Sequence, residues 1–196
     1  MKIALLSPIS WWTHQKYYES LETIVSLLYE GLVNRGVDVT LFTSSNSKTK
    51  GKSDCSFSSE NGSPPPSPCE ARNRGGVFWN EDERVLNSMA SASLRIARLF
   101  EKAGEFDLIH NCFDFIPLSY SRLIFTPMVS TICSLPSSGI IPVFREYGDR
   151  SYYVSISNAD RNPSLNYIST VYHGIDVNSF TFSESKGSYL VCFGSI

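Results

Sequence analysis

The chain has 196 residues, of which 42% are hydrophobic and 18% are charged, and its formal net charge is -2. This length supports one substantial hydrophobic core, and the composition excludes a chain that is disordered throughout. A weakly acidic chain is poorly suited to the many phosphate contacts that hold nucleic acid, so nucleic acid is excluded as a partner.

The amino-terminal sequence does not have the pattern of an export signal. Its apolar run breaks at Ser7-Pro8, which is too early for the core of a signal peptide, and no apolar stretch reaches membrane-spanning length. We therefore expect a cytoplasmic protein. The five cysteines include no C-x-x-C pair and the three histidines have no metal-binding spacing. We expect no disulfide framework, no metal site and no cofactor.

The beginning of the chain predicts a strand, a helix and a second strand. Residues 2–8 form a short apolar run, typical of a strand buried on both faces of a parallel sheet. Residues 20–35 carry leucine, isoleucine and valine at helical spacing, with Ser20 as the N-cap and Gly36 as the left-handed residue after the helix. Residues 37–44 alternate apolar and polar side chains, which predicts the second strand.

Residues 44–76 differ from the rest of the chain because they are rich in Ser, Gly and Pro and nearly free of large aliphatic residues. Such a segment buries too little surface to offset its ordering entropy. The sequence predicts a flexible surface insertion here, with a polyproline turn at Pro64–Pro66.

The remainder alternates between helices and strands. The strongest helix signal covers residues 80–104, with Asn80 as the N-cap and Gly104 as the stop, and the strand 106–111 follows directly. We then expect a short helix over 116–124, a strand over 127–133, a helix over 140–147, a strand over 152–157, a helical turn over 158–161 and a strand over 168–174. This order predicts an α/β protein with a Rossmann-like, doubly wound parallel sheet and helices on both faces.

Polar and aromatic residues follow the predicted strands at their carboxyl ends, where open parallel sheets bind ligands. The candidate substrate-binding residues are Ser10 and Trp12 after the first strand, His110, Asn111 and Asp114 after the third, Ser134 after the fourth, and His173 after the last. The predicted crevice is polar, aromatic and short of cations. Each histidine has two interpretations: it orients a ligand hydroxyl or phosphate, or it holds its own loop by hydrogen bonds.

Three common catalytic motifs are missing from the positions that they would need. The turn after the first strand has no glycine, so the dinucleotide fingerprint G-x-G-x-x-G is absent. Neither G-x-x-x-x-G-K-[ST] nor G-x-S-x-G occurs in the sequence. The sequence therefore indicates neither a Rossmann dehydrogenase, nor a P-loop nucleotidase, nor an α/β-hydrolase.

Six segments, in chain order, resemble the N-terminal half of family 4 retaining glycosyltransferases, which have the two-domain GT-B fold. They are "MKIALLSPISW", "SLLYEGLVNRGVDVTLFTS", "EFDLIHNCFDF", "TPMVSTICS", "VSISNADR" and "VYHGIDVNSF". The resemblance implies that residues 1–182 form the acceptor-side Rossmann-like domain, which faces a second domain that binds a nucleotide sugar.

The same resemblance carries expectations for single residues. In the family pattern, a histidine that reaches the reacting sugar stands where this chain has Cys133, so the resemblance assigns no catalytic residue here. Glu22 matches an acidic residue common at the start of the first helix. Residues 183–196 resemble a linker and the truncated first strand of a missing donor domain.

Two functions follow from this resemblance. The first is the acceptor-side domain of a glycosyltransferase that moves a hexose from a nucleotide sugar and is inactive without a donor-binding domain. The alternative is a degenerate, non-catalytic module that binds a glycan or a partner. The implied partners are a donor-domain chain, a sugar or glycolipid acceptor, and a second copy bound through the exposed interdomain face. The aromatic residues Trp11, Trp12, Tyr17 and Tyr18 suggest sugar stacking or peripheral membrane contact, against the simpler interpretation of loop packing.

Overall fold

The fold is an α/β structure built on one seven-stranded, all-parallel sheet. The computed structural model describes residues 1–8, 15–43, 51–54, 81–179, 181, 184 and 187–188. The strand order is β3-β2-β1-β4-β5-β6-β7. The strands are β1 (Lys2–Leu6), β2 (Asp38–Phe42), β3 (Ser53–Asp54), β4 (Leu108–Asn111), β5 (Met128–Ile132), β6 (Ser151–Ser155) and β7 (Tyr167–Thr170). This order confirms the predicted Rossmann-like, doubly wound sheet.

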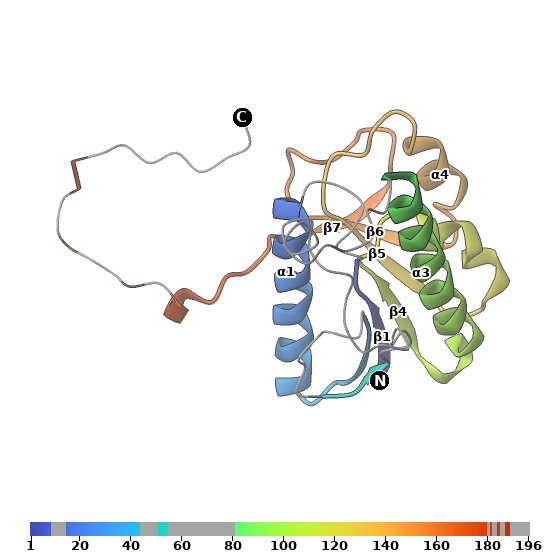
Figure 1. The fold of residues 1–196 in the computed structure, drawn as a ribbon, viewed down its shortest axis with the longest axis horizontal. Helices are drawn as coiled ribbons and strands as arrows, with labels where there is room; N and C mark the ends of the chain where they lie inside the picture. Colours follow the sequence, from blue (N-terminus) through green and yellow to red (C-terminus); the bar gives the residue numbers. More distant parts are fainter. Residues whose placement is uncertain are drawn as a thin grey trace, which may run out of the picture.

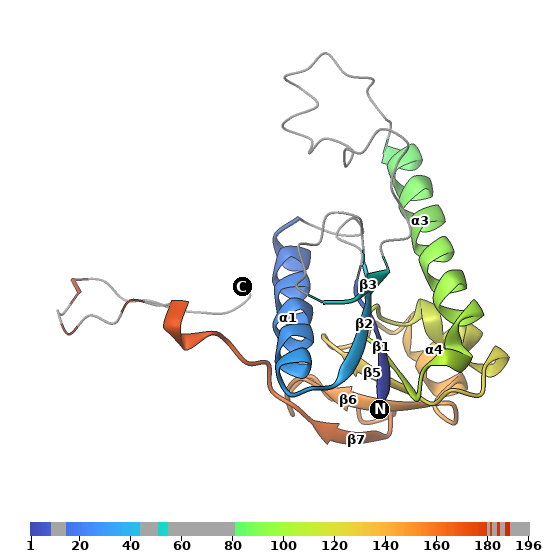
Figure 2. The same ribbon diagram turned by 90° about the horizontal axis from the view of Figure 1, so that it is seen from below.

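Helices cover both faces of the sheet, as Figures 1 and 2 show. The α-helices are α1 (Gln15–Asn34), α3 (Glu81–Glu101) and α4 (Ile141–Glu146), and the 3₁₀ helices are η1 (Ala103–Glu105), η2 (Ile116–Leu123) and η3 (Val177–Ser179). Strand-to-strand crossovers in parallel sheets are right-handed. The step from β1 to β2 therefore places α1 on one face, and the reversed direction from β4 to β7 places η2 and α4 on the other face with α3.

The core consists of two apolar clusters, one on each face. On the side of α1, which we call the α1 face, Ile3, Leu5, Val39 and Leu41 pack against Val25 and Tyr29 of the helix. On the other side, the α3 face, the cluster is larger and draws on β1, β2, β4, β5 and β6 together with α3, η2 and α4. Its largest fully buried side chains include Tyr153, Phe42 and Phe144.

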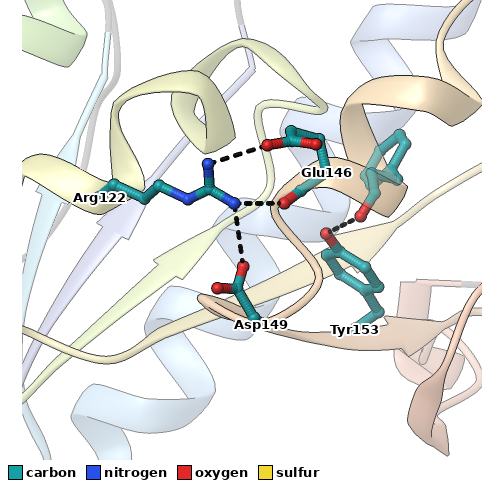
Figure 3. A network of polar contacts seen from close by, with 5 residues as sticks. Arg122, Glu146, Asp149 and Tyr153 are labelled. Carbon is teal, nitrogen blue, oxygen red and sulfur yellow. Dashed lines mark hydrogen bonds and ion pairs between the residues drawn. The ribbon is translucent and has the colours of Figure 1, made fainter.

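Hydrogen bonds and ion pairs connect η2, α4 and β6 on the α3 face (Figure 3). The Arg122 guanidinium in η2 donates to the Glu146 carboxylate at 2.9 Å and to the Glu146 carbonyl oxygen at 2.8 Å, and it lies 3.6 Å from Asp149. The Tyr153 hydroxyl in β6 donates to the Phe144 carbonyl oxygen at 2.6 Å. These contacts join η2, α4 and β6.

Helix α1 ends as predicted but begins earlier. Gly36 has φ 75°, its N–H donates to the Val33 carbonyl, and the Val37 N–H donates to the Leu32 carbonyl. These two bonds form a Schellman motif, which confirms the predicted stop. The helix starts at Gln15, so the prediction of Ser20 as an N-cap is wrong. Residues 15–19 contain no Gly or Pro, and Gln, Lys and Glu are good helix formers, which lets the helix extend toward its amino end.

The predicted insertion over 44–76 contains a strand that the composition did not indicate. Residues Ser53–Asp54 form β3, an edge strand that pairs in parallel with β2. The Lys52 carbonyl oxygen accepts hydrogen bonds from the Leu41 N–H at 3.1 Å and from the buried Tyr29 hydroxyl at 3.0 Å. Tertiary hydrogen bonds, rather than local propensity, thus place this segment. Residues 44–50 and 55–76 of the insertion lie outside the described residues.

Smaller differences concern element type and length. The short helix at Ile116 is a 3₁₀ helix, and residues 158–161 form a turn rather than a helical turn. The last strand ends at Thr170, four residues before its predicted end. The predicted donor-domain strand within 183–196 and the polyproline turn lie outside the described residues.

Candidate functional site

The chain reverses direction between β1 and β4, which are neighbours in the middle of the sheet. From β1 the chain passes to α1 on one face, and from β4 it passes to η2 on the other. Ligands of open α/β sheets bind outside the carboxyl ends of the two strands at such a point. Ser7 follows the end of β1 here, and Asn111, the last residue of β4, leads into the turn that contains Asp114.

Asn111 organises the turn after β4. Its side chain is fully buried. The Nδ2 group donates to the Asp114 carbonyl oxygen at 2.8 Å and to the Ser130 hydroxyl at 3.1 Å, and Oδ1 accepts from the Phe113 N–H at 2.9 Å. The Ser130 hydroxyl lies 2.8 Å from that of Ser151. Asn111 is thus part of a buried polar chain across β4, β5 and β6, and its side chain serves the turn itself.

Asp114 has the most unusual backbone at this edge. Its φ is 88°, a left-handed conformation that is strained for a residue with a Cβ. The residue as a whole is exposed to solvent. Loss of solvation beside the protein raises the pKa of the Asp114 carboxyl to about 6, and the hydrogen bond from the Phe115 N–H opposes this shift. At neutral pH the carboxylate is mainly ionised and can accept hydrogen bonds from a ligand.

Two cysteines follow β4 and β5 near Asp114. Burial raises the pKa of the half-buried Cys133 thiol to about 12, and the Asp114 carboxylate adds to this shift. The thiol points to the Thr131 carbonyl oxygen at 3.7 Å. Burial also raises the pKa of Cys112. Both groups are protonated thiols at neutral pH, so neither supplies a nucleophilic thiolate. Ser134, next in the chain, is exposed at the same edge.

His110 lies within β4 rather than beyond its end. Its neighbours Ile109 and Asn111 face α3, so His110 points toward the α1 face, where Nε2 lies 2.8 Å from the Thr131 hydroxyl. Burial lowers the pKa of the imidazole to about 4. The ring is therefore neutral at pH 7 and joins β4 to β5. This geometry favours the structural interpretation of His110, in which the imidazole stabilises the neighbouring strand by a hydrogen bond and does not contact a ligand.

The other predicted site residues do not gather with Asp114 among the described residues. Glu22 is half-buried about two turns into α1, not at its start, because the helix begins at Gln15. His173 lies beyond β7, three strands from β4, which is about 14 Å at the usual spacing of parallel strands. Burial lowers the pKa of His173. Ser10 and Trp12 lie outside the described residues.

A buried cation at this edge was not predicted from the sequence. Arg95 of α3 is only 5% exposed, and its guanidinium donates to the Ser7 carbonyl oxygen at 3.5 Å. This guanidinium is bonded to the residue after β1 and is not exposed at the edge, so the predicted shortage of cations in the crevice stays a prediction. A signal was present: the buried stripe of α3 includes Ala92, Ile96 and Leu99, and Arg95 occupies the i+3 position of that stripe.

The arrangement combines an exposed carboxylate, an exposed serine hydroxyl and two protonated thiols around the end of β4 and β5. Within the described residues, no three His, Cys, Asp or Glu side chains are placed to hold a metal ion. None of the described helices combines the length and apolar character needed to cross a membrane. No model of a known protein family matches the chain, and no curated protein does either.

Proposed function

We propose that this chain is the acceptor-side domain of a glycosyltransferase that transfers a hexose from a nucleotide sugar. The observation that carries the proposal is the point between β1 and β4 where the direction of the chain across the sheet reverses. Beyond β4, the Asn111 side chain bonds the Asp114 carbonyl oxygen and fixes the position of Asp114. The six sequence segments of the resemblance supply the reaction class. In this proposal the protein works in the cytoplasm.

The chemistry of the carboxyl edge suits a neutral, hydroxylated acceptor. An ionised carboxylate accepts hydrogen bonds from sugar hydroxyl groups and repels a phosphate. Ser134 adds an exposed hydroxyl that both donates and accepts. The buried Arg95 guanidinium is directed at the Ser7 carbonyl oxygen rather than at the surface. Asp114 and Ser134 therefore act as the acceptor contacts in our proposal.

Catalysis in this proposal depends on a donor-binding domain outside residues 1–196. Hexosyl transfer needs positive charge or hydrogen-bond donors at the leaving nucleotide. Cys133 stands where the family resemblance implies a histidine. A thiol has no cationic form in water, and with a pKa of about 12 this thiol is neutral at pH 7. The partner domain would have to provide the groups that stabilise the leaving nucleotide.

The alternative function is a non-catalytic module that binds a glycan or a partner at the same edge. The specific observation in its favour is Cys133, whose thiol is turned toward the Thr131 carbonyl oxygen. Both functions share the binding of a hydroxylated ligand. They differ in whether a donor domain restores transfer.

The binding step can be tested by amide NMR with two probes, methyl α-glucopyranoside and UDP-glucose. We expect the glycoside to shift the amides of residues 111–115 and 133–134, and UDP-glucose alone to leave them unchanged. Asp114→Asn should weaken the glycoside effect, whereas Asp149→Asn, an exposed carboxylate at the opposite edge of the sheet, should not. Tight binding of UDP-glucose to the isolated chain, or no glycoside shifts at millimolar concentration, would contradict the proposal.

A further inference from the structure

One part of the sheet lacks a helical cover. Right-handed crossovers place every connection between β4 and β7 on the α3 face. On the α1 face, the apolar cluster beneath α1 has no buried member from β5, β6 or β7. Figure 2 shows α1 beside β1 and β2, away from β6 and β7. Parallel sheets are normally covered on both faces, so the α1 side of β5–β7 is an incomplete surface within the described structure.

The side chains on this surface follow from strand alternation. Tyr153 and Tyr167 belong to the α3 face and are paired, so Tyr152 and Val154 point the other way. The pairing of β6 with β7 shifts register after this pair, and Val154 lies opposite Ser169. Ile168, between Tyr167 and Ser169, is the extra residue of this bulge. Val129 and Thr131 are the register partners of Tyr152 and Val154 in β5. We call these five residues, Val129, Thr131, Tyr152, Val154 and Ile168, the open sheet face.

Large apolar side chains on and beside the open sheet face are exposed to solvent. Tyr152 is 55% exposed and Ile168 is 61% exposed. Phe125, in the loop before β5, is fully exposed and lines a shallow hollow of about 160 Å³ together with Tyr152. The hollow lies at the amino ends of β5 and β6, and Tyr152 belongs both to it and to the open sheet face.

The size of this surface points to a weak interface. Three large side chains that are more than half exposed present on the order of 400 Å² of apolar area. The largest apolar patch of a monomer is commonly about 300–600 Å² and is often functional. Two such patches in contact bury about 1,000 Å² in total with their surroundings, which is the lower limit for a specific interface.

The charges around this surface fit contact between identical copies. None of the five side chains of the open sheet face carries a charge, so a two-fold axis brings no like charges together at its centre. The hollow at its rim has one acid and one base, Asp149 and Arg150. Depletion of charge at the centre with a polar rim is typical of protein interfaces. We propose that two copies of the chain associate weakly and reversibly through the open sheet face.

This inference does not depend on the proposed glycosyltransferase function, because the open sheet face lies on a flat side of the sheet and the ligand edge lies at the strand ends. Sedimentation velocity from about 1 to about 200 µM protein tests it, a range that brackets the affinity of small interfaces. We expect the average mass to rise from that of a monomer toward that of a dimer. Ile168→Asp and Tyr152→Asp should each weaken association at least about tenfold, a change of about 1.4 kcal/mol.

The control is Leu86→Asp, since Leu86 is 66% exposed on α3, which packs on the opposite face of the sheet; it should associate as the unchanged chain does. Ile168→Ser and Tyr152→Ser are milder replacements in case an aspartate disturbs folding. A monomer at every concentration would overturn the proposal, as would a dimer that all four substitutions leave intact. A chain that dimerises only after removal of residues 180–196 would also overturn it, and would assign the open sheet face to those residues.

Discussion

The Asn111 side chain donates a 2.8 Å hydrogen bond to the carbonyl oxygen of Asp114, three residues later, and so fixes a left-handed residue at the carboxyl edge of the sheet. The same buried side chain bonds the Phe113 N–H and the Ser130 hydroxyl. Asn111→Ala removes all three bonds and should lower the free energy of unfolding by about 2–3 kcal/mol, measured by urea denaturation. Asn178→Ala, at an exposed position, is the control and should change it by less than about 0.5 kcal/mol.

Asp114 itself should be replaceable by glycine with a gain in stability. With φ at 88°, a side chain with a Cβ is strained, and glycine removes that strain at a cost in unfolded-state entropy of less than about 1 kcal/mol. We expect Asp114→Gly to match or exceed the unchanged chain in thermal unfolding, and Asp114→Ala to fall below it. Asp114→Asn keeps a residue that tolerates this conformation. A stabilised alanine variant would show that the turn relaxes and that the strain has no functional meaning.

Most of the fold could be predicted because it depends on local, repeating signals. The apolar run of β1, the helical spacing in α1 and the helix stop at Gly36 can each be recognised within a few residues of sequence, and the structure confirms them. The two residues of β3, Ser53 and Asp54, have no local sequence pattern that predicts a strand. The position of β3 depends on Lys52, whose carbonyl oxygen is bonded by Tyr29 and Leu41 from distant parts of the chain.

The candidate site was predictable in its location but not in its details. The carboxyl ends of the strands could be named from the sequence. Whether a residue there faces α1, α3 or the open edge depends on where each strand stops. His110 lies one residue before the end of β4, so its side chain points to the α1 face of the sheet. Asp114 lies three residues beyond the end of β4 and is exposed to solvent. The burial of Arg95 could not be predicted from its residue type, because arginine is mostly exposed in folded proteins.

His110 should titrate far below an ordinary histidine. Its pKa is lowered from 6.5 to about 4 by burial, so between these values the unfolded chain binds more protons than the folded one. The contribution of His110 to stability should therefore be complete above about pH 6.5. It should fall as the pH decreases through this range, by on the order of 3 kcal/mol. Histidine NMR resonances give the pKa directly. A His110 midpoint above pH 6 would contradict the buried bond to Thr131.

Asp114 contributes a pH dependence of the opposite sign, so the two effects must be separated. Its folded pKa is raised from 3.8 to about 6, which means that its contribution to stability is present at low pH and is lost as the pH rises through 6. In Asp114→Asn, the loss of stability on acidification should therefore be steeper than in the unchanged chain. In His110→Gln it should be shallower. Urea midpoints between pH 4 and pH 7 measure both slopes, and identical slopes in all three proteins would rule out this assignment.

Tyr29 should anchor β3 to the rest of the sheet through the Lys52 carbonyl oxygen. Tyr29→Phe removes one hydrogen bond and should lower the free energy of unfolding by about 1 kcal/mol. Hydrogen exchange should become faster at the Leu41 amide, which donates to the same oxygen.

Gly51→Ala should lower the free energy of unfolding further, because a Cβ at Gly51 would clash with the Tyr29 hydroxyl. Gly139→Ala is the matched control, since a Cβ there meets no atom within 4 Å. It should leave Leu41 exchange unchanged and stability equal or slightly higher. If Gly51→Ala behaved like this control, β3 would not depend on contact with Tyr29.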